Sequence, residues 1–222
     1  MGGQATGDMK KMIALTLSAG LATAGAQTFG SGGIELGLTG GYASGLSGEV
    51  FIHAPNVVGP FGIKAGASYT RASTAIDTSD DLIVLDADRS GQHTIASLDG
   101  TYSLGELTPG VGATVYAGGR YGMFSATEDF GATGRLRYDT NPFGIGAGVM
   151  VSYALAGNLS LVGDVGVDQF FNTTINSTTT APDGSVTNDS FATNDGSYSA
   201  VSNRFVRPGT VFKARIGIKT TF

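Results

Sequence analysis

The side chains best suited to acid–base chemistry at neutral pH are two histidines, His53 and His93. Neither has a catalytic partner that can be recognised from the sequence. His53 shares one face of a predicted strand with Glu49, but no nucleophile stands at a spacing that would predict a Ser-His-Asp triad. His93 is expected at the edge of a strand, beside a loop. The 222-residue chain has no Cys, which excludes thiol nucleophiles, disulfides and Cys-based metal sites. We therefore expect no catalytic site and no cofactor.

A run of aspartates is the only metal-ligating pattern that the sequence suggests. Asp86, Asp88 and Gly91 open like a calcium-binding EF-hand loop, but the twelfth position holds Ser97 where the pattern requires Glu. Carboxylates at this density could attract divalent cations, yet a solvated acidic loop accounts for them equally well. We expect no metal site here. The acidic residues are Asp77, Asp80, Asp81, Asp86 and Asp88.

The remaining chemically capable side chains are charged residues that alternate with apolar ones. From Phe212 to Phe222, every second residue is uncharged and mostly apolar, while Lys213, Arg215 and Lys219 lie on the opposite face. Period-two alternation of this length is typical of a β-strand with one apolar and one charged face. The charged faces of the predicted strands together hold Glu35, Glu49, Lys64, Asp99, Arg120, Asp164, Asp168, Lys213, Arg215 and Lys219.

These charged residues must be positioned by strands, and the alternation predicts eight of them. An even number of strands with an uncharged apolar face is typical of a closed barrel in a bacterial outer membrane. The one charge on that face, Arg71, stands at the end of its strand, where it can reach lipid headgroups. We predict an all-β fold, an eight-stranded antiparallel up-and-down transmembrane β-barrel. The predicted strands are 33–43, 46–54, 61–71, 94–104, 111–124, 143–155, 159–171 and 211–222.

The connections between these strands differ in length. Short turns rich in Pro, Gly and Asn alternate with polar segments that are predicted as long loops at 72–93, 125–142 and 172–208. In the last of these, Val186 and residues 191–198 leave open a short hairpin outside the membrane. A soluble β-sandwich is the alternative fold. It is disfavoured because it would have to bury the charged faces or expose the apolar ones.

The charged faces are expected to fill the barrel. Eight strands enclose a lumen just wide enough for side chains, and buried charges are tolerated when they are paired. Closure of the barrel brings the cations of the last strand beside Glu35 of the first strand and Asp164 and Asp168 of the seventh. The glycines of the sixth strand leave room for Tyr116 and Arg120. We predict an internal salt-bridge network that plugs the lumen; the alternative is a narrow polar channel.

The N-terminus reads as a secretory signal peptide. Met9, the expected true start, is followed by Lys10, Lys11, a short apolar stretch and a small-x-small motif that ends at Ala26, after which we predict cleavage. The mature chain would carry 11 basic and 17 acidic side chains, a net charge of −6, which argues against nucleic acid as a partner. The signal region covers 1–26 and the barrel domain 27–222.

With these strands and the terminal residues Lys219 to Phe222, the sequence resembles the small eight-stranded outer-membrane family that includes OmpA, OmpX, OmpW and the opacity proteins. The resemblance covers roughly residues 33–222. It implies an integral protein of the bacterial outer membrane with periplasmic termini, in contact with membrane lipid. It also implies that Phe222 belongs to the signal read by the barrel-assembly machinery.

The resemblance leaves three functions open. The favoured one is a structural or adhesion-like surface role, with loops that contact partners. The second is a narrow passive channel for small or apolar solutes. The least favoured is a lipid-modifying enzyme, since some small barrels act on lipids.

Overall fold

The computed structural model describes residues 33–72, 76, 87–205 and 209–222. The predicted signal region 1–26 with its cleavage site at Ala26, and most of the acidic loop at 77–88, lie outside the described residues.

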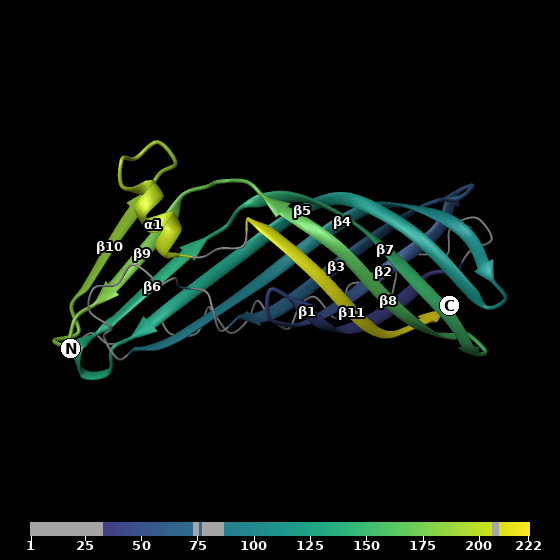
Figure 1. Cartoon of the computed structure of the whole chain (residues 1–222), viewed down its shortest axis with the longest axis horizontal. Coiled ribbons are helices and arrows are strands. Elements are labelled where there is room, and N and C mark those ends of the chain that lie inside the picture. Colours follow the sequence, from purple (N-terminus) through teal and green to yellow (C-terminus); the bar gives the residue numbers. More distant parts are fainter. Residues whose placement is uncertain (1–32, 73–75, 77–86, 206–208) are drawn as a thin grey trace, which may run out of the picture.

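Eight antiparallel strands close into a barrel, as the alternation predicts (Figure 1). Each strand pairs with its neighbours in order, β11 pairs with β1, and β5 pairs with β7, so the wall is continuous. The fold is therefore all-β, with an eight-stranded antiparallel barrel. Its strands are β1 (Glu35–Ala43), β2 (Leu46–Val58), β3 (Phe61–Ala72), β4 (Asp88–Thr108), β5 (Val111–Asp129), β7 (Phe143–Ala156), β8 (Leu159–Phe170) and β11 (Thr210–Thr221).

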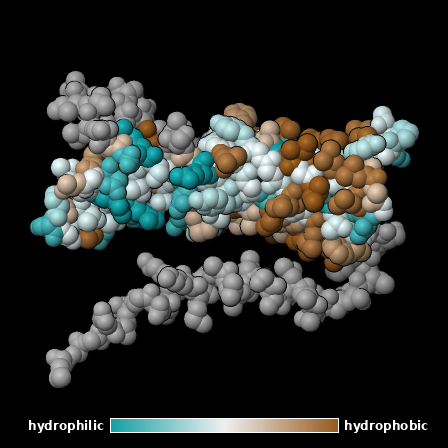
Figure 2. Space-filling view, turned by 90° about the horizontal axis from the view of Figure 1, so that it is seen from below, coloured by the Kyte–Doolittle hydropathy of each residue, from teal (hydrophilic) through white to brown (hydrophobic). Residues whose placement is uncertain are grey.

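The two faces of the wall differ sharply in exposure. In β3, Ile63 is 51% exposed on the outside, while its neighbour Lys64 is 1% exposed on the inside. Exposed large apolar side chains come from all eight strands and form an apolar belt. On the face seen in Figure 2, they gather over one half of the molecule, and the other half is largely hydrophilic. A belt of this kind is the surface that a barrel presents to lipid. Among the described residues, no helix is long and apolar enough to cross a lipid bilayer.

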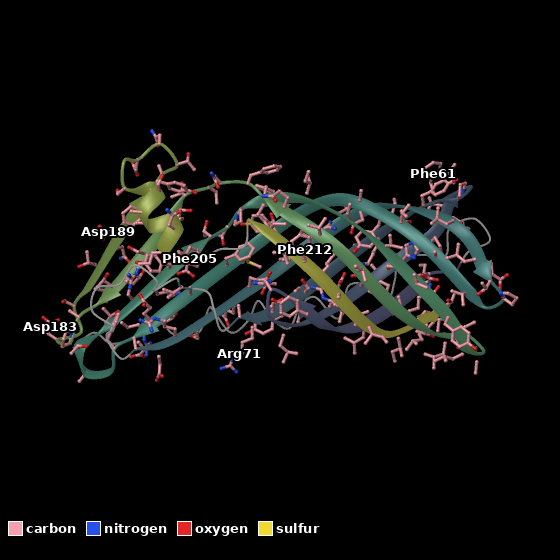
Figure 3. The ribbon with its side chains drawn as sticks, viewed as in Figure 1. Phe61, Arg71, Asp183, Asp189, Phe205 and Phe212 are labelled. Carbon is pink, nitrogen blue, oxygen red and sulfur yellow. The ribbon has the colours of Figure 1, made fainter. Side chains whose placement is uncertain are left out.

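Aromatic side chains mark both rims of the belt. Phe61 packs edge-on against Tyr102 at one rim, with ring centroids 5.1 Å apart, and Tyr121 lies 5.0 Å from Phe143 at the other. Figure 3 shows Phe61 near the end of the barrel and Phe212 near the middle of the molecule. Aromatic rings at both membrane–water interfaces are typical of outer-membrane barrels.

The structure differs from the sequence expectation in the polar connections. Strand β5 continues to Asp129, and after the short 3-10 helix η1 (Gly131–Thr133) the chain returns as β6 (Arg135–Thr140). Residues 172–208, predicted as a long loop with a hairpin left open, form the hairpin β9 (Ile175–Thr180) and β10 (Val186–Phe191), followed by helix α1 (Tyr198–Arg204). The order β5-β6-β9-β10 extends the barrel wall into a sheet beyond the belt, which we call the extension (Figure 1).

The extension has its own hydrophobic core. Phe205 is 1% exposed and stacks on Tyr138 of β6 at 5.7 Å between centroids, and Ile175 and Ala126 are buried beside them. This core continues down to Phe124 at the mouth of the barrel. The extension is thus a packed structure, although β9 and β10 are rich in Thr, Ser and Asn.

Candidate functional site

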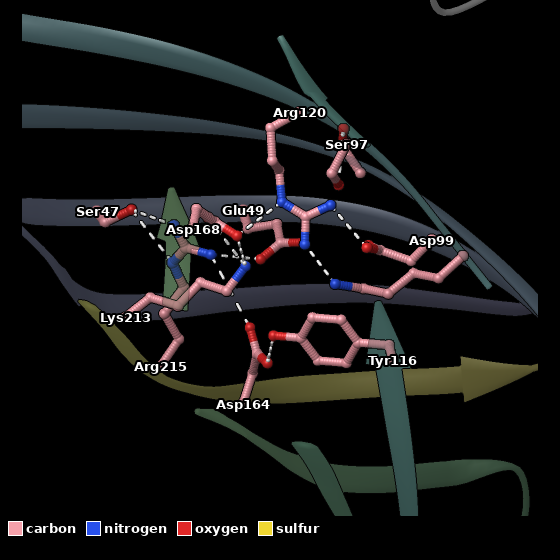
Figure 4. A network of polar contacts seen from close by, with 12 residues as sticks. Ser47, Glu49, Ser97, Asp99, Tyr116, Arg120, Asp164, Asp168, Lys213 and Arg215 are labelled. Atoms are coloured by element: carbon pink, nitrogen blue, oxygen red, sulfur yellow. Dashed lines mark hydrogen bonds and ion pairs between the residues drawn. The ribbon is translucent and has the colours of Figure 1, made fainter. Parts of the chain in front are cut away.

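The ten charged residues that the sequence assigns to the strand interiors all project into the lumen. Nine are at most 8% exposed. The tenth, Lys219, keeps 12% of its side chain exposed near the end of the chain. The structure brings them into linked clusters, two of them in the middle of the barrel and one near the chain termini (Figure 4 shows the middle of the barrel).

Arg120 of β5 is the centre of the first cluster. Its Nη1 donates to Oδ1 of Asp99 on β4 at 2.6 Å, and its Nε donates to Oδ1 of Asp168 on β8 at 2.7 Å. Lys213 of β11 adds a second cation to Asp168, with Nζ 3.0 Å from Oδ1. Both side chains of the Arg120–Asp99 pair are completely buried. Four strands are therefore tied together inside the lumen.

Glu49 of β2 is the centre of the second cluster. It accepts a hydrogen bond from Nζ of Lys64 at 2.7 Å and one from Nη1 of Arg215 at 2.5 Å. Arg215 also donates through Nη2 to Oγ of Ser47 at 2.9 Å. Strand β1 lies between β11 and β2, and its residue opposite Arg215 is Gly41. Arg215 therefore reaches across β1 at Gly41, which is paired with Arg215 on one side and with Ser47 on the other.

The sequence expectation placed Arg215 against the adjacent strands. In the structure, its ion pair with an adjacent strand is long, 3.9 Å from Nη1 to Oδ2 of Asp164, and its principal partner is Glu49. Lys219 and Lys213 do meet carboxylates of the neighbouring strands: Lys219 Nζ lies 2.6 Å from Oε1 of Glu35.

His53 belongs to the cluster near the chain termini. Its Nδ1 lies 2.7 Å from Oε2 of Glu35, and its Nε2 lies 3.0 Å from Oγ1 of Thr101. Both ring nitrogens therefore have partners, and neither partner is an activated nucleophile. This arrangement positions the imidazole as a structural link between β1, β2 and β4.

The expected position of His93, at a strand edge beside a loop, is wrong. Strand β4 begins at Asp88, so His93 lies within the strand; it is 2% exposed and 5.0 Å from the ring of Phe124. Its neighbour on the inner face, Ile95, is apolar. Within the described ranges, no group of three or more His, Cys, Asp or Glu side chains is placed to hold a metal ion.

Tyr116 occupies the space beside the glycines of β7, as the sequence predicts; its bond to Asp164 is the part that the sequence did not reveal. Its Oη donates to Oδ1 of Asp164 at 2.5 Å, and Nζ of Lys64 lies 4.9 Å from its ring centroid. A Cβ at Gly148 would collide with the phenol oxygen, so the glycine of β7 makes the space that the ring occupies. An inward tyrosine opposite glycines, on a strand flanked by inward charges, is the sequence signal for this role.

Little space remains between these side chains. A cavity of about 10 Å³ lies between Glu49, Arg120, Asp168 and Arg215, which is about the volume that one water molecule needs.

Comparisons with known proteins place the barrel among outer-membrane structures. A crystal structure of a major outer membrane protein from Thermus thermophilus matches with a TM-score of 0.79 and 26% identity, over 87% of this chain and 100% of that one. CarO of Acinetobacter baumannii matches with a TM-score of 0.45 and 12% identity, over 89% and 100% of the two chains. Neisserial surface protein A matches with a TM-score of 0.38 and 15% identity, over 85% and 94%.

Of these three, the Thermus protein alone has a TM-score above 0.5, so the structural argument depends on it. No protein-family model and no curated protein matches the sequence. The match covers the whole Thermus chain. Together with the apolar belt, it shows that this chain folds as an eight-stranded barrel of the outer-membrane type.

Proposed function

We propose that this outer-membrane barrel has a structural or surface-interaction role and that its lumen does not conduct. The observation that supports a closed lumen is the position of Arg120, which is buried and paired with Asp99 of β4 and Asp168 of β8. With the lumen filled, the part of the protein left to contact other molecules is the hydrophilic extension.

We further propose that the extension faces the cell exterior and that both termini are periplasmic. The backbone amide of Phe222 donates to the carbonyl of Ile34 at 2.9 Å, so the two ends of the barrel wall meet at one rim. This rim lies at the end of the molecule opposite the extension, where the C-terminus is marked in Figure 1. Short turns at the periplasmic end and longer segments outside are the usual asymmetry of such barrels.

The proposed partners follow from this orientation. The apolar belt contacts membrane lipid, and Phe222, which is 72% exposed at the terminal rim, is available to the barrel-assembly machinery during insertion. Surface partners would contact the extension, whose outermost strand β10 is almost entirely exposed and pairs only with β9 among the described strands. A strand with a free edge can accept another strand.

The proposal includes no enzymatic activity. His53 is held by Glu35 and Thr101, and replacement of this histidine by Ala should leave lipid turnover at the background rate of an empty bilayer. Loss of a measurable turnover in His53→Ala would instead establish the lipid-modifying alternative.

Two measurements test the proposal. The refolded protein should migrate differently in detergent gels with and without boiling, and it should show no steady single-channel openings in planar bilayers. Steady openings of the unmodified protein would overturn the sealed lumen in favour of the passive channel. On intact cells, an external protease should cut the β9–β10 hairpin and spare a matched cleavage site inserted at Gly59, in the turn between β2 and β3. The reverse pattern would overturn the orientation.

A further inference from the structure

The inner faces of five barrel strands change from charged to apolar next to the extension. Toward the extension, Phe170 is the next inward residue after Asp168 on β8, and Val211 is the next after Lys213 on β11. We use the name mouth plug for the apolar residues on the inner faces of β1, β4, β5, β8 and β11 at this end. None of them is more than 4% exposed. They are Ala43, Ile95, Phe124, Phe170 and Val211.

Two aromatic rings of the mouth plug meet inside the barrel. Phe124 of β5 and Phe170 of β8 are in edge-on contact, with ring centroids 5.0 Å apart, although β7 lies between their strands. A Cβ at Gly144 of β7 would lie 2.9 Å from Cδ1 of Phe170. A Cβ at Gly122 of β5 would overlap the ring of Phe124 and lie 3.0 Å from that of Phe170. The two rings therefore occupy space inside the wall that glycines leave open.

The mouth plug is packed between the ion pairs and the extension. On the side of the lumen, Ile95 lines the small cavity that Arg120 also borders. On the other side, the plug continues into the hydrophobic core that contains Phe205. The ring of His93 lies against Phe124, with centroids 5.0 Å apart. A path from the ion pairs to the extension would thus have to pass between tightly packed, mainly apolar side chains.

We propose that the mouth plug is a second seal of the barrel, in series with the ion pairs, and that it blocks ions even when those pairs are broken. Side chains of Ala, Ile, Phe and Val have no polar atom that could replace the water around an ion, so its entry between them is unfavourable. Narrow apolar constrictions close pores by excluding water in this way. The inference rests on the proposed closed lumen and states what closes it at the end next to the extension.

A labelling experiment on the full barrel in detergent tests the plug, because the chain has no Cys of its own. Ser68→Cys places a single thiol just inside the plug, since Ser68 is buried, lines the small cavity and lies opposite Ile95 in register. The probe is a charged methanethiosulfonate reagent, and its attachment is followed by mass spectrometry. The thiol should react slowly while the plug is intact. Added Phe170→Ala should accelerate the reaction about tenfold or more, because it makes local opening of the mouth easier.

Phe51→Ala, in the same Ser68→Cys background, is the matched control. Phe51 is buried like Phe170, but it belongs to a separate apolar cluster with Tyr116 and Met150. Labelling should stay slow in this variant. Equal acceleration by the two changes, or slow labelling in Phe170→Ala, would overturn the proposal. Retained heat-modifiable migration would show that each variant is folded, and Val211→Ala, a smaller loss from the same plug, should accelerate labelling in the same direction.

Conductance separates this inference from the proposed function. The unmodified protein and Arg120→Ala, which breaks the central ion pairs but keeps the plug, should both be silent in planar bilayers. Steady openings of Arg120→Ala beside a silent unmodified protein would overturn the second seal and leave the proposed function intact. Steady openings of the unmodified protein, with fast labelling of Ser68→Cys while the plug is intact, would overturn the closed lumen itself.

Discussion

Arg120 of β5 and Asp168 of β8 are joined by a 2.7 Å contact between Nε and Oδ1, although strand β7 lies between their strands. The contact passes over Gly146 of β7, which faces the lumen at this point. A Cβ at Gly146 would lie 2.7 Å from Arg120 Nε and would overlap Oδ1 of Asp168. The central ion pair of the lumen therefore depends on a glycine in a third strand.

Replacement of Gly146 by Ala should disturb this pair. The added methyl group has no free space, and overpacking of this kind typically costs about 1–3 kcal/mol. The expected result is a lower urea midpoint for loss of the heat-modifiable form in gels. Gly119→Ala is the control, because a Cβ at Gly119 meets no atom within 4 Å. Equal midpoints for the two variants would contradict the proposed crowding.

Asp168→Asn should be strongly destabilising. It removes the charge shared by Arg120 and Lys213, and uncompensated buried charge costs about 3–5 kcal/mol. The free energy of unfolding, from urea titrations followed by tyrosine fluorescence, should fall accordingly.

The matched control is Asp139→Asn in the exposed pair with Arg137, where the expected loss is below about 1 kcal/mol. A loss for Asp168→Asn no larger than that of the control would mean that the lumen is hydrated well enough to stabilise the free cations.

Phe205→Ala should loosen the extension and spare the barrel. The ring of Phe205 is 1% exposed against Tyr138, and loss of a buried Phe side chain typically costs about 3–5 kcal/mol. We expect faster protease cleavage after the change, confined to the extension, with unchanged gel migration of the barrel. Val186→Ala, at a 57% exposed position of β10, should leave the cleavage rate unchanged. Loss of barrel migration in Phe205→Ala would show that the two cores unfold together.

The exposed pair between Asp129 and Arg135 predicts a pH dependence in the extension. The hydrogen bond from Arg135, helped by the backbone amide of Gly131, holds the pKa of the Asp129 carboxyl below its usual value. Since the folded pKa is the lower one, the pair stabilises the extension above the unfolded pKa of about 3.9, and that contribution disappears as the pH falls through the folded value. NMR titration of Asp129 should show a higher pKa in Arg135→Gln, and an unchanged pKa would contradict the assignment.

The barrel wall could be predicted from the sequence because its signal is local. Alternation sends Lys64 inward and Ile63 outward whatever their neighbours are, since successive side chains of a strand point to opposite faces. The position of the last strand beside the first followed from closure alone, and the structure places Lys219 within 2.6 Å of Glu35.

The sequence left the β9–β10 hairpin only as an open alternative to a long loop, because these two strands carry no alternation of apolar residues. β9 and β10 are rich in Thr, Ser and Asn, and they form strands because β5 runs on to Asp129 and gives β6 an edge to pair with. The same continuation at the start of β4 moves His93 from an expected strand edge into the interior.

The sequence by itself determined the closed eight-stranded wall, its apolar belt and the inventory of charges inside it, because each of these follows from residue type and a period of two. Only the tertiary structure decided which charges meet across an intervening strand; Lys213 and Lys219 meet carboxylates of adjacent strands, as closure of the barrel predicts. Arg120 meets Asp168 across β7, where Gly146 leaves the space that their side-chain atoms occupy, and Arg215 meets Glu49 across β1. Such choices depend on register and on distances between strands, which no pattern along the chain encodes.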